Sequence, residues 1–118
     1  MKNKRVGMTD DMVFKIKADF LKGLSHSIRL QIIEHLKNGE ASVAKLVQEL
    51  GVEQSNLSRH LATLRDLGIL QARQEKTTVY YSIHDHDIFK ILRPIAEVLR
   101  KKLKRSEVIL ESLGKEER

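Results

Sequence analysis

The residues between Gln54 and Thr63 combine small and hydrogen-bonding side chains in a helical pattern. If Leu57, Leu61 and Leu64 face a core, a rotation of about 100° per residue places the polar members on the outside of this helix. The outer and flanking positions carry hydroxyl, amide and guanidinium groups: Gln54, Ser55, Asn56, Ser58, Arg59 and Thr63. A solvated face is usually rich in Glu and Lys, whereas these groups hydrogen-bond to base edges in the major groove. The pattern therefore predicts contacts with double-stranded DNA.

His60 and Arg29 each admit two roles from the sequence alone. His60 lies beside Leu57 and Leu64 on the inner flank of the same helix, so it either packs in a partly buried position or contacts a phosphate. We include it among the candidate DNA contacts. Arg29 either forms an internal ion pair or orients the helices that meet DNA.

Two short helices joined by a tight turn are predicted to position this polar face. Ser42 is placed to cap the first helix, which carries apolar residues at helical spacing and ends at Gly51. The second begins at Gln54 or Ser55 and stops near Gly68. This order is the helix-turn-helix pattern. Ser42 serves as a cap, and at that helix end it is also a candidate phosphate contact.

A β-hairpin follows, because the apolar period changes from about 3.6 to about 2 in residues 69–72 and 79–83. The polar run 73–78 between them predicts a hairpin with a basic tip. Four side chains of this tip are candidates for contact with the phosphate backbone or the minor groove: Arg73, Lys76, Thr77 and Thr78. A solvated turn is the alternative.

The remaining segments have helical apolar spacing. We expect helices over 11–24, over 25–37 with Ser25 as its cap, and from Asp85 onward, with Pro94 kinking or splitting the last one. The apolar stripe along the last helix is broader than the core of a small monomer needs. This favours a homodimer through the first and last helices over closure of the monomer core. The candidate dimerisation residues are Val13, Ile16, Phe20, Ile88, Leu92, Ile95 and Leu99.

Composition bounds the possible functions. The 118 residues suit one folded domain, which we place at 11–113 between a flexible segment at 1–10 and a flexible tail at 114–118. The net charge of +6 indicates a polyanionic partner, either nucleic acid or an anionic membrane surface. No apolar run reaches the roughly 20 residues that span a bilayer, so we expect a cytoplasmic protein without a membrane partner. The sequence has no cysteine, which excludes disulfides and thiolate ligands within this chain.

Three segments in succession resemble signatures of the ArsR/SmtB family: residues 24–33 (LSHSIRLQII), 55–64 (SNLSRHLATL) and 79–83 (VYYSI). The resemblance implies a mostly α fold with a β-hairpin wing, the winged helix-turn-helix, in an α+β architecture. It also implies a homodimeric repressor that binds an inverted-repeat operator and is released by a metal ion or another signal.

Two metal sites of that family can be compared with this sequence. One uses cysteines in the helix before the recognition helix, and residues 41–47 contain none. The other pairs ligands at the start of the last helix with ligands about a dozen residues later, where the candidates for zinc or nickel are Asp85, His86, Asp87 and Glu97. Arg100 and Lys101 beside the second group oppose a cation. A helix cap at Asp85 is therefore the favoured interpretation, and no cofactor is assigned.

The function predicted is that of a DNA-binding transcriptional regulator. No nucleophile with an adjacent base, phosphate-binding glycine loop or HExxH spacing is present, so an enzyme is not expected. The alternative is a winged-helix module that binds protein or RNA. Such a module would more often carry apolar or acidic residues where this chain has Ser55, Asn56, Ser58 and Arg59.

Overall fold

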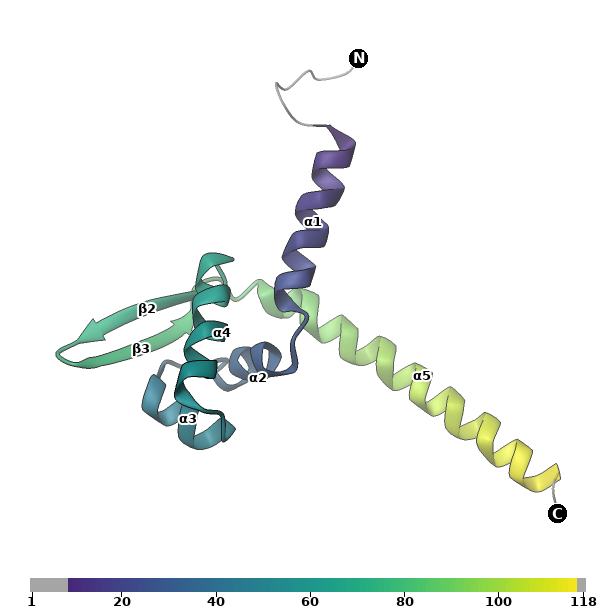
Figure 1. The fold of residues 1–118 in the computed structure, drawn as a ribbon. Helices are drawn as coiled ribbons and strands as arrows, with labels where there is room; N and C mark the ends of the chain where they lie inside the picture. Colours follow the sequence, from purple (N-terminus) through teal and green to yellow (C-terminus); the bar gives the residue numbers. More distant parts are fainter. Residues whose placement is uncertain (1–8, 117–118) are drawn as a thin grey trace. The chain divides into compact units, whose positions relative to one another are not determined.

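The computed structural model describes residues 9–116 as five helices and a three-stranded antiparallel sheet (Figure 1). In chain order the elements are α1 (Asp10–Leu24), α2 (Ser27–His35), β1 (Ala41–Ser42), α3 (Val43–Leu50), α4 (Gln54–Asp66), β2 (Leu70–Glu75), β3 (Thr78–Ile83) and α5 (Ile88–Glu116). The chain divides into two compact units, one up to Asp85 and one from His86 onward. The predicted mostly α fold with a β-hairpin is confirmed.

The first two helices begin at side-chain caps. Thr9 accepts the backbone N–H of Met12 at the start of α1, as an N-cap hydroxyl should. The cap of α2 is His26, whose Nδ1 accepts the N–H of Ile28 at 3.1 Å. The prediction of Ser25 as that cap is wrong, because Ser25 is the C-terminal cap of α1.

The core of the first unit is formed by leucine and isoleucine side chains at the helical spacing noted in the sequence. Seven of them are almost fully enclosed: Ile32, Ile33, Leu36, Leu46, Leu57, Leu61 and Leu64. They come from α2, the residue that follows it, α3 and α4. The core therefore fixes the two helices of the predicted helix-turn-helix against α2.

The hairpin is longer and its turn tighter than the sequence predicted. Strands β2 and β3 pair from Leu70 with Ile83 to Glu75 with Thr78, which leaves a two-residue turn at its tip. The first turn residue, Lys76, has a φ of 56°, as the turns that match the twist of a two-residue hairpin require. Figure 1 shows β2 and β3 side by side. The strand order of the sheet is β1-β3-β2, so β3 is the middle strand.

The helix boundaries at the two ends of the described chain differ from those predicted, and α5 begins at Ile88, three residues after the predicted start at Asp85. Residues 1–8 and 117–118 of the predicted flexible ends lie outside the described residues. Asp10 already belongs to α1, and α5 extends past residue 113 to Glu116. Helix α5 also continues through Pro94 as one element and is not split. Within residues 9–116, none of the helices has the length and apolar character needed to cross a bilayer.

Candidate nucleic-acid interface

Helices α3 and α4 form a helix-turn-helix with the predicted cap and turn. The Ser42 hydroxyl accepts the backbone N–H of Lys45 at 3.1 Å, which satisfies one of the free donors at the start of α3. Gly51 ends the helix with a φ of 65°, a left-handed conformation that glycine adopts without a steric penalty. Three residues later Gln54 begins α4.

Helix α4 has one buried face and one exposed face. Leu57, Leu61 and Leu64 have no exposed surface, and His60 between them is 6% exposed. Their burial fixes the rotation of the helix about its axis. The opposite face of α4 is therefore exposed to solvent regardless of which side chains it carries.

The exposed face carries the polar groups singled out in the sequence. Ser55, Ser58 and Arg59 are exposed, while Asn56 and Thr63 are half-buried. The Arg59 guanidinium donates to the Asn56 side-chain oxygen at 2.6 Å, so the amide holds the cation along the helix surface. Both partners have further hydrogen-bonding capacity, and this arrangement therefore presents donors and acceptors together.

Two polar groups on this helix are engaged locally. The Ser55 hydroxyl donates to a carboxylate oxygen of Glu53 at 2.6 Å, and the Thr63 hydroxyl donates to the backbone carbonyl of Arg59 at 3.1 Å. Contact with a DNA base would require the Ser55 hydroxyl to leave Glu53. The Glu53 carboxylate beside the exposed face was not among the predicted site residues.

A surface hollow brings residues of α4 together with residues of the hairpin. It is lined by Val43, Ala44, Gln54, Ser58, Thr77, Thr78, Val79 and Tyr81. Four of these, Gln54, Ser58, Thr77 and Thr78, were predicted as DNA contacts from segments about 20 residues apart. The fold thus places the polar end of α4 and the hairpin turn on one surface.

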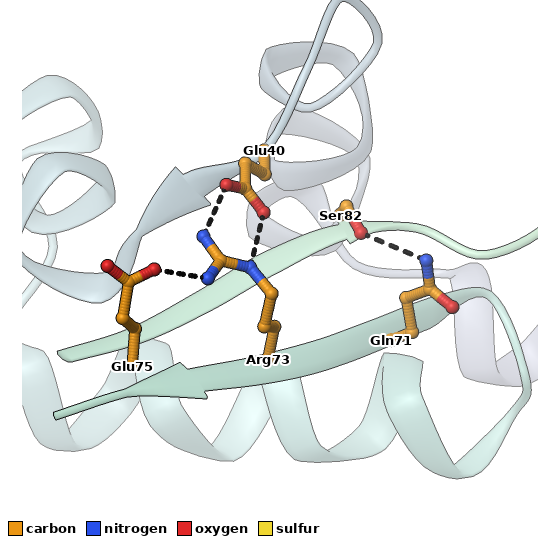
Figure 2. Close-up of polar contacts among 5 residues, drawn as sticks. All are labelled: Glu40, Gln71, Arg73, Glu75 and Ser82. Atoms are coloured by element: carbon orange, nitrogen blue, oxygen red, sulfur yellow. Dashed lines mark hydrogen bonds and ion pairs between the residues drawn. The ribbon is translucent and has the colours of Figure 1, made fainter.

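Arg73 lies within β2 and not in the turn. Its guanidinium forms two hydrogen bonds to Glu40, at 2.6 and 3.3 Å, and one to Glu75 at 2.6 Å (Figure 2). It also lies 4.6 Å from the centre of the Tyr80 ring. The hydrogen bond from Arg73 lowers the pKa of Glu40, and the two carboxylates raise the pKa of Arg73, so the Glu40–Arg73 pair is charged at neutral pH.

The hairpin is consequently not the basic element that the sequence predicted. Arg73 is compensated by Glu40, a residue 33 positions earlier in the chain, as well as by Glu75 on its own strand. Only the Glu75 partner could have been found from the sequence, because residues two apart on a strand point to the same face. Among the four predicted contacts, Lys76 at the turn is exposed and forms no ion pair within the described residues.

His60 does not lie on the exposed face, so its inclusion among the DNA contacts is corrected. The centre of its ring lies 4.2 Å from the centre of the His26 ring, and its Nδ1 accepts a hydrogen bond from Arg29 Nε at 3.1 Å. Burial, followed by the nearby His26, Arg29 and Arg59, lowers the pKa of His60. This hydrogen bond joins α2 to α4, which agrees with a role for Arg29 in orienting the helices that meet DNA.

The candidate metal ligands are not gathered in one place. Within residues 9–116, no three His, Asp or Glu side chains form a group that could hold a metal ion. Asp87 is paired with Lys90 at 3.1 Å, and Glu97 with Arg100. The ring of His86 lies 6.1 Å from the ring of Phe89. A site built within one described chain is therefore not supported by these contacts.

Helices α1 and α5 each expose large apolar side chains. In α1 these are Met12, Phe14, Ile16 and Leu21; in α5 they are Ile91, Ile95, Val98, Leu99, Leu103, Val108, Ile109, Leu110 and Leu113. Three of the predicted dimerisation residues, Ile16, Ile95 and Leu99, belong to these sets. Val13, Phe20 and Leu92 are half-buried. Ile88 is 5% exposed in the single chain and so is not available to a partner.

Known proteins resemble this chain in sequence and in fold. The profile of the family described as "Bacterial regulatory protein, arsR family" matches residues 26–72. An uncharacterized HTH-type transcriptional regulator of Mycobacterium tuberculosis, Rv0081, is 36% identical over 107 residues, which cover 90% of this chain and 94% of the relative. Its crystal structure has a TM-score of 0.72 at 37% identity and covers 79% of this chain and 94% of that one.

Two further structures share the fold. One is the homodimeric winged helix-turn-helix DNA-binding domain of Mb0332 from Mycobacterium bovis, with a TM-score of 0.69, 27% identity, and coverage of 86% of this chain and 95% of that one. The other is the transcriptional repressor BigR from Xylella fastidiosa, with a TM-score of 0.64, 31% identity, and coverage of 77% and 96%. The chain therefore belongs to the ArsR family of bacterial regulatory proteins and is a DNA-binding regulator of transcription, not an enzyme.

Proposed function

We propose that this chain binds an inverted-repeat DNA operator as a homodimer and represses transcription. The observation that carries the proposal is the exposed face of α4, where Ser58, Asn56 and Arg59 stand opposite a fully buried leucine face. In helix-turn-helix proteins the second helix lies in the major groove and contacts base edges through its N-terminal residues. The proposed contacts are Ser42, Gln54, Ser55, Asn56, Ser58, Arg59, Thr63, Lys76, Thr77 and Thr78.

These contacts divide by chemistry. Arg59 and Asn56 have the planar donor and acceptor groups that pair with guanine and adenine edges, so they are assigned to sequence recognition. Lys76 and the neighbouring threonines at the hairpin turn are assigned to the phosphate backbone, which fixes the position of the protein without selecting a sequence. Ser42 at the start of α3 is a candidate phosphate contact as well.

The homodimer is supported by the apolar side chains that α1 and α5 expose. Ile16, Ile95 and Leu99 are each about half exposed. A soluble monomer rarely exposes so many large apolar side chains, and the related domain of Mb0332 is homodimeric. A two-fold dimer places its two recognition helices about 34 Å apart, one turn of DNA, so the operator is expected to be a pseudo-palindrome. Repression is favoured by the similarity to BigR, and a cytoplasmic location, beside the chromosome, follows from the proposed activity.

The test is selection of DNA from a random-sequence duplex library by the purified chain, followed by binding measurements on the enriched duplex. We expect an inverted repeat with half-sites about one turn apart. Arg59→Ala should reduce the preference for the enriched duplex over a scrambled one by about 1–3 kcal/mol per half-site. Arg65→Ala, the same change at the far end of α4, is the matched control and should preserve that preference. Enrichment of no sequence would refute the proposal.

Repression itself is tested in cells with a reporter gene whose promoter contains the enriched repeat. Expression of the chain should lower reporter output, and the Arg59→Ala variant should restore it. An increase in output would show activation instead.

A further inference from the structure

One guanidinium group connects three helices of the first unit. Arg29 lies on α2, half-buried, and its Nε donates to His60 Nδ1 on α4 at 3.1 Å. A second nitrogen of the same group donates to the backbone carbonyl of Gly23 in the last turn of α1 at 2.7 Å. The end of α1 is also close to the end of α4, since a Cβ added at Gly23 would lie 2.4 Å from a methyl carbon of Leu67. Arg29 thus bridges two helices whose ends pack tightly.

The hydrogen bond between Arg29 and His60 fixes the protonation state of the imidazole. An arginine side chain has only donors, so Nδ1 of His60 must carry no proton in order to accept. The ring is then neutral, with its proton on Nε2. A second proton on the ring would occupy Nδ1, remove the acceptor and place two cationic donors against each other.

The surroundings of His60 all oppose that second proton. The ring is 6% exposed, and the charged or titratable groups that act on it are Arg29 and His26 at the start of α2 and Arg59 on its own helix. All three disfavour positive charge on the His60 ring. Within the described residues, no buried side-chain nitrogen or oxygen lacks a hydrogen-bond partner, so uptake of a proton would create the first such defect.

The position of this pair gives it a consequence for DNA binding. His60 lies on the inner face of α4, one residue from Arg59 on the outer face. Any shift of α4 that relieves a charged His60 therefore moves the groups that meet the bases. Base contacts tolerate little displacement, because bidentate hydrogen bonds require both distance and direction.

We propose that Arg29 and His60 form a positioning pair that holds α4 in the orientation required for operator binding, and that proton uptake by His60 releases the operator. This inference rests on the proposed DNA-binding function. Arg29 and His60 touch no base in this proposal. They act through the helix that carries Arg59 and Ser58.

The proposal predicts a pH dependence opposite to that of simple electrostatics. Acidification adds positive charge to a protein, which strengthens its attraction to phosphates. The positioning pair predicts weaker operator binding on acidification instead. The sign of the pH effect on the specific duplex therefore separates the two explanations, and a scrambled duplex provides the electrostatic reference.

The experiment measures the affinity of the full chain for the enriched inverted-repeat duplex by fluorescence anisotropy from about pH 8 to about pH 5. We expect a loss of about tenfold or more for the wild type, because each pKa unit by which DNA binding lowers the pKa of His60 corresponds to a tenfold change. His60→Asn keeps an acceptor near the position of Nδ1 but binds no proton, so its affinity should not fall. His35→Asn, the same change at an exposed histidine of α2, is the control and should retain the wild-type loss.

A proton NMR titration of the His60 ring in the wild type, with and without the duplex, accompanies the binding series and does not depend on a variant folding. We expect the pKa of the His60 ring to lie below the ordinary value of a histidine and to fall further when the duplex is bound. Constant or tighter operator binding at low pH with a protonated His60 would overturn the proposal, as would a His60 that stays neutral until the chain unfolds. A chain that enriches no DNA at pH 8 would instead refute the proposed function.

Discussion

The charge balance of the hairpin predicts that its two positively charged side chains contribute differently to DNA binding. Arg73→Gln and Lys76→Gln each remove one positive charge from the hairpin. The Arg73 charge is already compensated by Glu40 and Glu75, at 2.6 Å each, whereas Lys76 stands at the turn without an ion pair among the described residues. Only Lys76 is therefore expected to displace a counterion from a phosphate.

The magnitude follows from counterion release. Each phosphate neutralised by a protein changes the slope of log Kobs against log salt concentration by about 0.9. A dimer carries two copies of Lys76, so Lys76→Gln should reduce the slope by about 1.8. Arg73→Gln should change it by less than half as much. Because both variants lose the same charge, long-range effects cancel in the comparison.

The assay is a titration of the enriched duplex by fluorescence anisotropy at several salt concentrations from about 50 to about 200 mM. Glu40→Gln adds a complementary measurement, since it frees part of the Arg73 guanidinium and should steepen the slope. A reduction with Arg73→Gln equal to that with Lys76→Gln would refute the reasoning, because Arg73 would then have to leave Glu40 for a phosphate in the complex.

Four further predictions concern stability and assembly. Leu57→Ala, at a position with no exposed surface, should lower the free energy of unfolding by about 2–5 kcal/mol, measured by urea unfolding at constant protein concentration. A decrease below about 1 kcal/mol would mean that the core is not packed as described. Ser42→Ala should lower the free energy of unfolding by about 1 kcal/mol through loss of the α3 cap, whereas Ser42→Asp, which retains a capping side chain, should not. The Glu40 pKa is lowered by Arg73, so the pair stabilises the fold above the ordinary value of 4.5 and loses this effect as the pH falls through the lowered pKa; the melting temperatures of wild type and Glu40→Gln should therefore differ at neutral pH and converge in acid. Leu99→Asp should convert the proposed homodimer to monomer in light scattering, and an unchanged mass would place the interface elsewhere.

Local signals in the sequence were sufficient to predict the helix-turn-helix. The leucine spacing gave α4 and its two faces, and Ser42 and Gly51 marked the ends of α3, because caps and helical period depend only on neighbouring residues. The same reasoning failed at Ser25. The cap of α2 is instead His26, whose Nδ1 accepts the backbone N–H of Ile28, two residues later. Histidine is not among the preferred capping residues, so no propensity rule identifies it.

Long-range contacts could not be predicted in this way. The bond of Arg73 to Glu40 joins residues 33 apart, and that of Arg29 to His60 joins residues 31 apart. Strand β1 has two residues and no period of its own, and it forms because Ala41 pairs with Tyr81. These features depend on the tertiary arrangement, which brings together residues that no local pattern connects. The candidate base contacts were found from the sequence, whereas the charge of the hairpin and the burial of His60 required the fold.

The strand order β1-β3-β2 leaves β2 at the edge of the sheet, with one row of backbone donors and acceptors not paired within it. An edge of this kind can add a strand from another molecule, which is a common route to aggregation. Along β2, Arg73 and Glu75 are exposed, and their mutual ion pair keeps both charges at this edge. An incoming strand would have to desolvate these charges. The same residues that compensate the charge of Arg73 therefore also oppose strand addition at the β2 edge of the sheet.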